Sequence, residues 1–326
     1  MRGNPYVCNI MADRPSIDLI TGAGGFSARH LAKRLRDAGK SRICGIGRAA
    51  SVLNSHLDSY AACDLRDKNS VAKAIRELRP TRVFHLAGQA KGEPGDLYSN
   101  NVVGTVLLIE ALREYCPEVE MLLVGSAAEY GSVDPLHLPI KEAQPCQPVG
   151  PYGISKYAMT MVGIDCFKRH GMKIVVARPF NIIGPGISED FLVGALLKRI
   201  RLSIESGTGA PVKVGNIDTE RDFVSVEDTV DAYISMMSGG FWGEVFNVCS
   251  GVPVSVRTVM DKLAAIAGVP IRFEVDSSLV RPQDVRVSYG SHQKATERFG
   301  FRPKLTLESF LRKSWEYSLS SLTNHL

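Results

Sequence analysis

Short apolar runs alternate along the first half of the chain with longer segments in which apolar residues recur at helical spacing. The apolar runs predict strands at 16–21, 42–47, 82–87, 120–126 and 173–178, and the helical patterns predict helices at 29–38, 68–78, 97–115 and 152–170. Parallel strands need long crossover connections, which helices commonly provide. The alternation therefore predicts an α/β fold with a Rossmann-type, doubly wound parallel sheet.

The regular alternation loosens after Pro179, where short elements and Gly/Pro turns follow. We therefore expect three parts. Residues 1–15 are predicted to be a disordered N-terminal extension. Residues 16–180 are predicted to form the nucleotide-binding domain, joined by returning segments from the C-terminal half. Residues 181–326 are predicted to form mainly a smaller substrate-binding lobe.

A glycine-rich turn links the first predicted strand to the first predicted helix. Gly22 suits a tight turn, Gly25 lets the backbone approach a pyrophosphate, and Ala28 suits close packing of helix on sheet. The N-terminus of the helix then presents N–H groups to the phosphates. The strand–turn–helix context predicts a dinucleotide site.

Tyr152 and Lys156 stand four residues apart at the start of a predicted helix. This spacing places both side chains on one face, about one turn apart. A nearby ammonium is expected to lower the pKa of the phenol from about 10 towards neutrality, so that the phenol can exchange a proton near neutral pH.

Composition restricts the class of protein. The chain has 326 residues, 44% hydrophobic content and a net charge of +5 without a basic run, which implies neither a nucleic-acid nor a membrane partner. The seven cysteines and seven histidines show no metal-ligand spacing, so no metal is expected. Reduced cysteines and the lack of a signal-peptide pattern favour a cytoplasmic protein.

The motifs together resemble those of the extended short-chain dehydrogenase/reductase family over about residues 16–318. They are TGAGGF at 21–26, DL at 64–65, HLAG at 85–88, NVVGT at 101–105, SAAEYG at 126–131, YGISK at 152–156 and RPFN at 178–181. The second half is similar to one branch, the GDP-4-dehydro-6-deoxy-D-mannose reductases that form GDP-D-rhamnose and their GDP-mannose dehydratase relatives. The motifs for this branch are NIIGPG at 181–186, VGNI at 214–217, RDF at 221–223, NVCSG at 247–251 and RP at 281–282.

This resemblance implies a site. Ser126, Tyr152 and Lys156 would form the catalytic triad, with Asn101 in support. The cofactor-binding positions would be Gly22, Gly25, Phe26, Arg48, Asp64, Leu65, Leu86, Ala87, Gly88, Tyr152 and Lys156. The substrate-binding positions would be Ser126, Asn181, Arg221 and Arg281, the two arginines gripping the diphosphate of a GDP-linked sugar. The family also implies a homodimer formed through two helices of each subunit.

The end of the second predicted strand bears on cofactor choice. NAD-preferring Rossmann folds carry an Asp or Glu there that binds the ribose 2′-hydroxyl. This chain has Arg48 after Gly45 and Gly47, and a guanidinium can pair with a 2′-phosphate. The sequence therefore predicts a preference for NADP(H), with NAD(H) as the alternative.

Several other side chains near the motifs are not expected to take part in the chemistry. We expect Asp222 to brace Arg221, and His85 to be a core residue. In the dehydratase relatives, acidic groups lie among the two residues that follow the triad Ser or Thr. These places are Ala127 and Ala128 here, and Glu129 is expected to point elsewhere. The sequence therefore predicts no dehydratase activity.

Three alternatives to the GDP-D-rhamnose-forming reductase remain open. One is a nucleotide-sugar 4-epimerase, which uses the same triad and keeps a tightly bound NAD. Another is the reductase that forms the 6-deoxytalose epimer. The third is a dinucleotide-binding protein without catalysis, against which the intact Ser126, Tyr152 and Lys156 argue.

Overall fold

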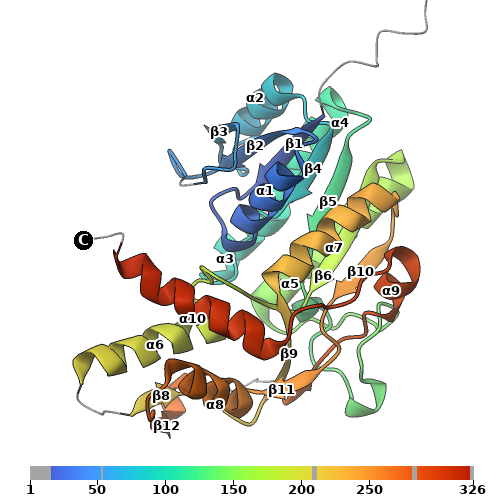
Figure 1. Ribbon diagram of the computed structural model, residues 1–326. Coiled ribbons are helices and arrows are strands. Elements are labelled where there is room, and N and C mark those ends of the chain that lie inside the picture. The colour runs from blue at the N-terminus through green and yellow to red at the C-terminus, as the bar shows by residue number, and fades with distance from the viewer. Residues whose placement is uncertain (1–15, 53, 208–210, 281–284, 324–326) are drawn as a thin grey trace, which may run out of the picture.

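A parallel seven-stranded sheet organises the computed structural model, which describes residues 16–52, 54–207, 211–280 and 285–323 (Figure 1). The strand order is β10-β6-β5-β4-β1-β2-β3. The bounds are β1 Ile17–Thr21, β2 Arg42–Gly47, β3 Ser59–Ala62, β4 Arg82–His85, β5 Glu120–Val124, β6 Lys173–Pro179 and β10 Val245–Val248. The order reverses between β1 and β4, so the carboxyl ends of these strands border the crevice in which such sheets bind ligands. The doubly wound α/β fold predicted from the sequence is confirmed.

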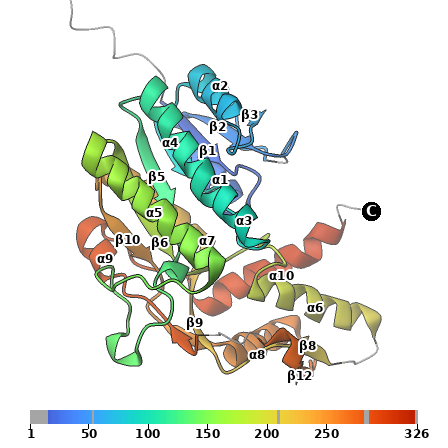
Figure 2. The same ribbon diagram turned by 180° about the vertical axis from the view of Figure 1, so that it is seen from behind.

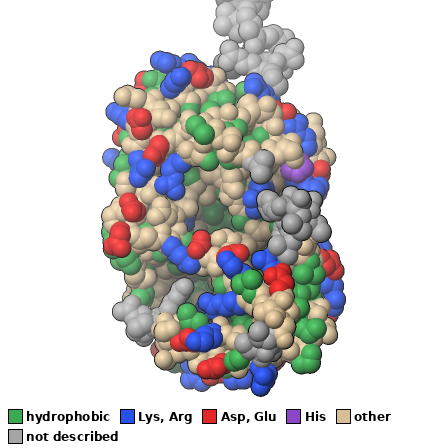
Figure 3. All heavy atoms as spheres, turned by 90° about the vertical axis from the view of Figure 1, so that its left-hand side faces the viewer, with side chains coloured by type: hydrophobic (Ala, Val, Ile, Leu, Met, Phe, Trp, Pro, Cys, Tyr) green, Lys and Arg blue, Asp and Glu red, His purple; other side chains and the backbone are tan. Residues whose placement is uncertain are grey.

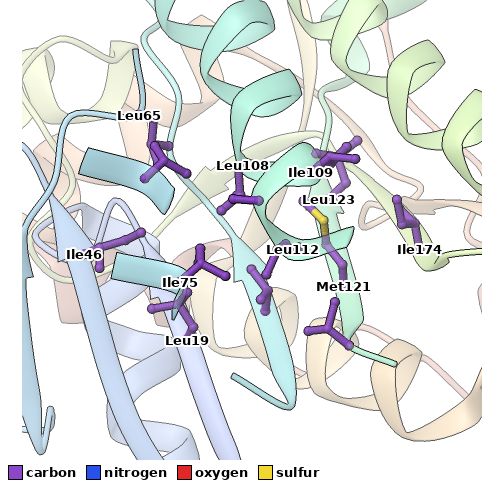
Figure 4. Packing of buried hydrophobic residues seen from close by; sticks show 14 of the residues in the cluster. Leu19, Ile46, Leu65, Ile75, Leu108, Ile109, Leu112, Met121, Leu123 and Ile174 are labelled. Atoms are coloured by element: carbon purple, nitrogen blue, oxygen red, sulfur yellow. The ribbon is translucent and has the colours of Figure 1, made fainter. Parts of the chain in front are cut away.

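One face of the sheet is covered by α2 (Lys68–Leu78), α4 (Gly104–Tyr115) and α5 (Gly150–His170). Leu19, Ile75 and Leu112 are fully buried in the resulting core, which Figure 4 shows closely. The opposite face is covered by α1 (Phe26–Ala38), α7 (Val226–Gly239) and α9 (Gln293–Phe299). Successive strand residues such as Leu19 and Ile20 point to opposite faces, so a continuous apolar run supplies both cores.

The smaller lobe lies beyond the carboxyl ends of the strands (Figures 1 and 2). Its helices are α6 (Leu192–Ser206), α8 (Val256–Ala267) and α10 (Leu307–Thr323). Its strands are β7 (Asn181–Ile183), β8 (Val212–Val214), β9 (Glu220–Ser225), β11 (Pro253–Ser255), β12 (Phe273–Val275) and β13 (Val287–Ser288). β9 pairs with β7, β11 and β13, and a third core packs the three helices together.

The predicted elements need three corrections. The first helix begins at Phe26, three residues before the predicted start, because Gly25 adopts the extended N-cap conformation. The predicted helix at 97–115 is divided into α3 (Pro94–Leu97), a π-helical turn η1 (Tyr98–Val103) and α4. β3 was missed because its half-buried SYAA sequence has little apolar signal.

The predicted extension at residues 1–15 lies outside the described residues. Within the described part, no helix combines the length and the apolar character needed to cross a membrane. The same residues contain no cluster of three or more His, Cys, Asp or Glu side chains suited to a metal ion.

Candidate active site

The glycine-rich turn brings the backbone of β1 close to that of the β4 turn. Gly22 has a φ of +67°, and a Cβ there would lie 2.9 Å from the Cα of Ala87. Only glycine accommodates both the conformation and this contact. The next helix, α1, starts with no side-chain cap, so its first N–H groups are not satisfied by a capping side chain. The turn therefore has the features of a pyrophosphate cradle.

A cleft opens beside this turn, at the carboxyl ends of β1, β2 and β4. Gly22, Gly47, Arg48, Cys63, Asp64, Leu65, Ala87, Gly88, Gln89 and Asn100 line it. Six of the predicted cofactor residues are thus brought together from four separate segments of the chain. Gly25 lies in the adjacent turn, whereas Phe26 and Leu86 pack against the core behind it. Viewed from the side, the surface is hollowed at mid-height, between the two lobes (Figure 3).

Acidic and basic side chains lie together at the end of the cleft where the chain leaves β2 and β3. Arg48 is exposed directly after β2. Asp64 forms an ion pair with Arg66 at 2.6 Å, and that hydrogen-bonded pair, with the charge of Arg48 beyond it, lowers the pKa of Asp64. No carboxylate follows β2 directly, because its last residue, Gly47, is followed by Arg48 and Ala49. An anion such as a 2′-phosphate therefore meets positive charge at this strand end.

Tyr152 and Lys156 lie on the first turns of α5, next to Ser126 from the end of β5. Lys156 is 5% exposed, and its Nζ donates to the carbonyl oxygen of Val124 at 2.6 Å. A Cβ on Gly88 would approach this Nζ to 3.3 Å, so the ammonium reaches the turn that lines the cleft. Burial lowers the pKa of Lys156 to about 8.

The expected lowering of the Tyr152 pKa by Lys156 is wrong for this structure. Burial raises the pKa of the phenol, and a hydrogen bond with Ser126 opposes the rise. The reason is geometric, because the Lys156 ammonium is directed to the carbonyl of Val124. Tyr152 is therefore protonated at neutral pH, which is the form that a proton donor requires.

Asn101 couples the cleft to α5. It is fully buried within the π-helical turn η1, where its Oδ1 accepts from Gln89 N–H at 2.7 Å. Its Nδ2 donates to the Gln89 carbonyl and to the Ser155 hydroxyl, each at 2.9 Å. Ser155 precedes Lys156, so Asn101 ties the β4 turn to α5, the helix that carries Tyr152 and Lys156. π-Helical turns recur at functional sites because they redirect one side chain.

His85 is a core residue, as predicted. Its two ring nitrogens pair with the hydroxyls of Thr21 at 2.7 Å and Thr105 at 2.9 Å. Burial lowers its pKa to about 3, so the ring is neutral and serves as a hydrogen-bonding link between β1, β4 and α4.

The predicted substrate residues lie on the facing lobe. Asn181 is exposed on β7 and donates to the Asp222 carbonyl oxygen at 2.8 Å. Arg221 is half-buried on β9 and donates to the Glu220 carbonyl oxygen at 2.9 Å. The predicted Arg281 lies outside the described residues.

The expected role of Asp222 is wrong. Its carboxylate is buried and accepts hydrogen bonds from Ser250 N and Oγ, both at 2.7 Å, from Gly251 N at 2.9 Å and from Gly290 N at 3.2 Å. Neighbouring strand residues point to opposite faces, so Asp222 faces away from Arg221. Asp222 instead joins β9 to the loops that follow β10 and β13.

A buried polar network behind the triad was missed at the sequence level. Glu129 is fully buried, forms an ion pair with Arg178 and accepts from the backbone N–H of Ser126. Arg178 also contacts Tyr130, whose hydroxyl donates to Asn247 at 2.8 Å. The spacing Ser-x-x-Glu at 126–129 is a capping box, and this signal was readable in the sequence.

Comparisons with known proteins agree with this geometry. The family model described as GDP-mannose 4,6 dehydratase matches residues 19–314. The chain is 32% identical over 305 residues to a GDP-6-deoxy-D-mannose reductase of Pseudomonas aeruginosa, covering 91% of this chain and 96% of the relative.

Two solved structures superpose on most of the chain. RMD from Pseudomonas aeruginosa, complexed with NADPH, is 30% identical with a TM-score of 0.82, covering 94% of this chain and 99% of that one. UDP-glucose 4-epimerase from Thermotoga maritima, with UDP-glucose, is 26% identical with a TM-score of 0.83, also covering 94% and 99%.

Proposed function

This chain belongs to the GDP-mannose 4,6 dehydratase family of extended short-chain dehydrogenases/reductases, and we propose that it is a nucleotide-sugar 4-ketoreductase. The reaction is the NADP(H)-dependent reduction of GDP-4-dehydro-6-deoxy-D-mannose to GDP-D-rhamnose. The observation that carries the proposal is the geometry of the triad: Tyr152 is hydrogen-bonded to Ser126, and the Lys156 ammonium lies next to Gly88, which lines the glycine-turn cleft. Alanine stands at 127 and 128. The similarity to a GDP-6-deoxy-D-mannose reductase supports the choice of substrate.

The residues of the cleft fit a dinucleotide. The close approach of Gly22 to Ala87 leaves the backbone open to a pyrophosphate, which the N-terminus of α1 would bind. Arg48 would pair with the 2′-phosphate of NADP(H). Lys156 would hold the nicotinamide ribose. When bound, NADPH supplies the hydride.

The triad supplies the proton and the hydrogen bonds. The Ser126 Oγ accepts from Ala128 N–H at 3.1 Å and is hydrogen-bonded to Tyr152, so its own hydrogen would turn to the 4-keto oxygen when the substrate binds. That hydrogen bond strengthens as negative charge develops on the oxygen. Tyr152, protonated at neutral pH, gives its hydroxyl proton to the same oxygen, so the keto group becomes a hydroxyl.

The facing lobe would hold the substrate. Arg221 would bind the diphosphate with its planar guanidinium, and Arg281 is proposed to do the same. The exposed Asn181 amide is anchored through its nitrogen, so its oxygen would accept from a sugar hydroxyl.

A 4-epimerase is the second candidate, supported by the similarity to UDP-glucose 4-epimerase. The two functions differ in how the cofactor is used. A reductase exchanges its oxidised cofactor in every turnover, whereas an epimerase regenerates its cofactor in place. The deciding experiment mixes the purified protein with NADPH and GDP-4-dehydro-6-deoxy-D-mannose. Stoichiometric loss of NADPH absorbance supports reduction, and NMR of the product distinguishes GDP-D-rhamnose from the 6-deoxytalose epimer.

Tyr152→Phe provides the matched variant for this experiment. It removes one hydroxyl and should lower kcat by about 10²- to 10⁴-fold, the usual contribution of a general acid. Folding and NADPH binding should be nearly unchanged, as measured by thermal unfolding and by fluorescence titration. If Tyr152→Phe turns over at the wild-type rate, the proton comes from another group.

We also propose a homodimer formed through α4 and α5. Figure 2 shows these two helices side by side on the outer face of the sheet. Val103, the last residue of η1 and directly before α4, is 46% exposed, and Ile154 and Met161 on α5 are 42% and 45% exposed. Exposed apolar side chains at such a surface suit an isologous contact with the same surface of a second copy.

A further inference from the structure

The Glu129 carboxylate is fully buried behind the triad. Its Oε1 accepts from the Ser126 N–H at 2.8 Å and from the Thr160 hydroxyl at 3.0 Å. Its Oε2 accepts from Nε of Arg178 at 2.7 Å. The side chain is 0% exposed. Burial raises the pKa of the Glu129 carboxyl, and the Arg178 guanidinium, the Ser126 N–H and the Thr160 hydroxyl oppose this rise.

These contacts connect Glu129 directly to Ser126 and, through Thr160, to the helix α5 that carries Tyr152 and Lys156. Ser126 is the N-cap of the short helix η2 (Ala127–Glu129), so the carboxylate fixes the backbone that aims its hydroxyl. Thr160 follows Lys156 by four residues on α5, and therefore lies on the same helix face one turn further along. Arg178 anchors the carboxylate to β6, so Glu129 links three elements that meet at the site.

The absence of a side chain at Gly125 leaves room for the Glu129 carboxylate. A Cβ at this position would lie 2.2 Å from Oε1 of Glu129 and 3.1 Å from the Thr160 hydroxyl. Because the first of these distances is far below van der Waals contact, any side chain at 125 would displace the carboxylate from Ser126.

The charged groups around Tyr152 and Lys156 come from several elements. Burial raises the pKa of Tyr152 and lowers that of Lys156, and the charge of Glu129 on η2 acts to raise both. His85 on β4 is neutral, Arg178 on β6 reaches the site through Glu129, and Tyr233 on α7 is buried and uncharged. Glu129 therefore supplies negative charge behind the ammonium and the phenol.

We infer that Glu129 is a positioning residue for the reduction proposed above, on which this inference rests. Its carboxylate orients the Ser126 hydroxyl towards the keto oxygen and balances the Lys156 ammonium in a buried site. It acts through these side chains and does not touch the substrate.

Glu129→Gln tests this role because it keeps the shape and removes the charge. The amide should lower kcat about 10- to 100-fold through misplacement of the donors, while KM for the keto sugar stays within about threefold. The alkaline limb of the kcat profile should move to lower pH, because the charge that raises the pKa of Tyr152 is lost. Glu142→Gln is the matched control. Glu142 also accepts a backbone N–H, from Asn247 at 2.8 Å, and its replacement should leave the alkaline limb in place.

A second measurement needs no substrate. The ultraviolet tyrosinate titration of the protein minus that of Tyr152→Phe reports the pKa of Tyr152. The same difference in the Glu129→Gln background should have a lower midpoint. This readout separates failure of the inference from failure of the proposed function, since it holds even if no keto sugar is reduced.

Should Glu129→Gln fail to fold, Glu129→Asp keeps the charge but shortens the reach to Ser126. The shorter side chain should weaken the contact with Ser126 and so lower kcat, provided that the protein reduces the keto sugar. With or without turnover, the tyrosinate midpoint should stay near that of the wild type. A folded Glu129→Gln with an unmoved Tyr152 midpoint would overturn the inference. A Glu129→Asp variant whose Tyr152 midpoint falls would overturn it as well.

Discussion

Arg48 follows β2 directly, lines the cofactor cleft and is exposed. A charge-assisted hydrogen bond is worth about 1.5–3 kcal/mol. Arg48→Ala should therefore raise KM for NADPH by about 10- to 100-fold and change KM for NADH little. Steady-state kinetics with both cofactors measure the difference. Arg42→Ala, at the opposite end of the same strand, should leave both values unchanged. Equal effects of Arg48→Ala on the two cofactors would contradict a contact with the 2′-phosphate.

The titration of the buried His85 makes the stability of the folded protein depend on pH. Its pKa is about 3 in the folded protein and about 6.5 when unfolded, because burial opposes protonation. The folded-state pKa is depressed, so stability is complete above about pH 6.5 and is lost as pH falls towards 3. The expected loss is about 1.4 kcal/mol per pH unit within this window.

Urea unfolding at pH 7 and pH 5 measures this loss. His85→Gln should have the shallower dependence of the unfolding free energy on pH, since glutamine does not titrate. The exposed His137 provides the control, and His137→Gln should keep the wild-type dependence. The same slope in wild type and His85→Gln would show that His85 is not held neutral.

At the scale of elements, the residues of η2 argue against dehydratase activity. Ala127 and Ala128 present methyl groups where dehydration would require a group that moves a proton. Glu129, the next residue, is buried and bound to Arg178. We therefore expect no 4-keto-6-deoxy product when the protein is incubated with GDP-mannose and cofactor. Mass spectrometry of the nucleotide-sugars checks this, and detection of the dehydrated product would refute it.

The outward faces of α4 and α5 form the proposed homodimer interface. Met161→Glu would bury a carboxylate in the proposed interface and should weaken dimerisation at least about 30-fold, the scale of a lost interface hot spot. Light scattering behind size-exclusion chromatography measures the mass over a concentration series. Leu136→Glu, at an 89% exposed position on the 3₁₀ turn η3 (Pro135–His137), should leave the mass unchanged. A wild-type protein that is monomeric throughout would exclude the dimer.

At the scale of the whole molecule, the site exists because the chain returns to its first lobe. After β7 the chain enters the smaller lobe, yet α7 covers the sheet and β10 extends it beside β6. Asn247 on β10 then contacts Tyr130 of the network behind the triad. The returning segments therefore complete the sheet lobe and its buried polar network.

The sequence by itself determined the sheet lobe and most of the cleft. Strand and helix periods are local properties, and the glycine turn at 22–25 needs only its own neighbours to adopt its conformation. Gly22, Arg48 and Ala87 were therefore placed correctly at strand ends, which meet on one edge in any sheet of this type. The position of His85 in the core followed from its apolar strand.

Only the tertiary structure decided the polar contacts between distant elements. Glu129 meets Arg178, and Asp222 meets Ser250, across 49 and 28 residues of sequence, so no local pattern specifies either pair. The pKa of Tyr152 likewise depends on burial by surrounding elements and on where Lys156 donates its hydrogen bond. Hydrogen bonds and desolvation act over a few ångströms in space, and the fold alone sets which groups come that close.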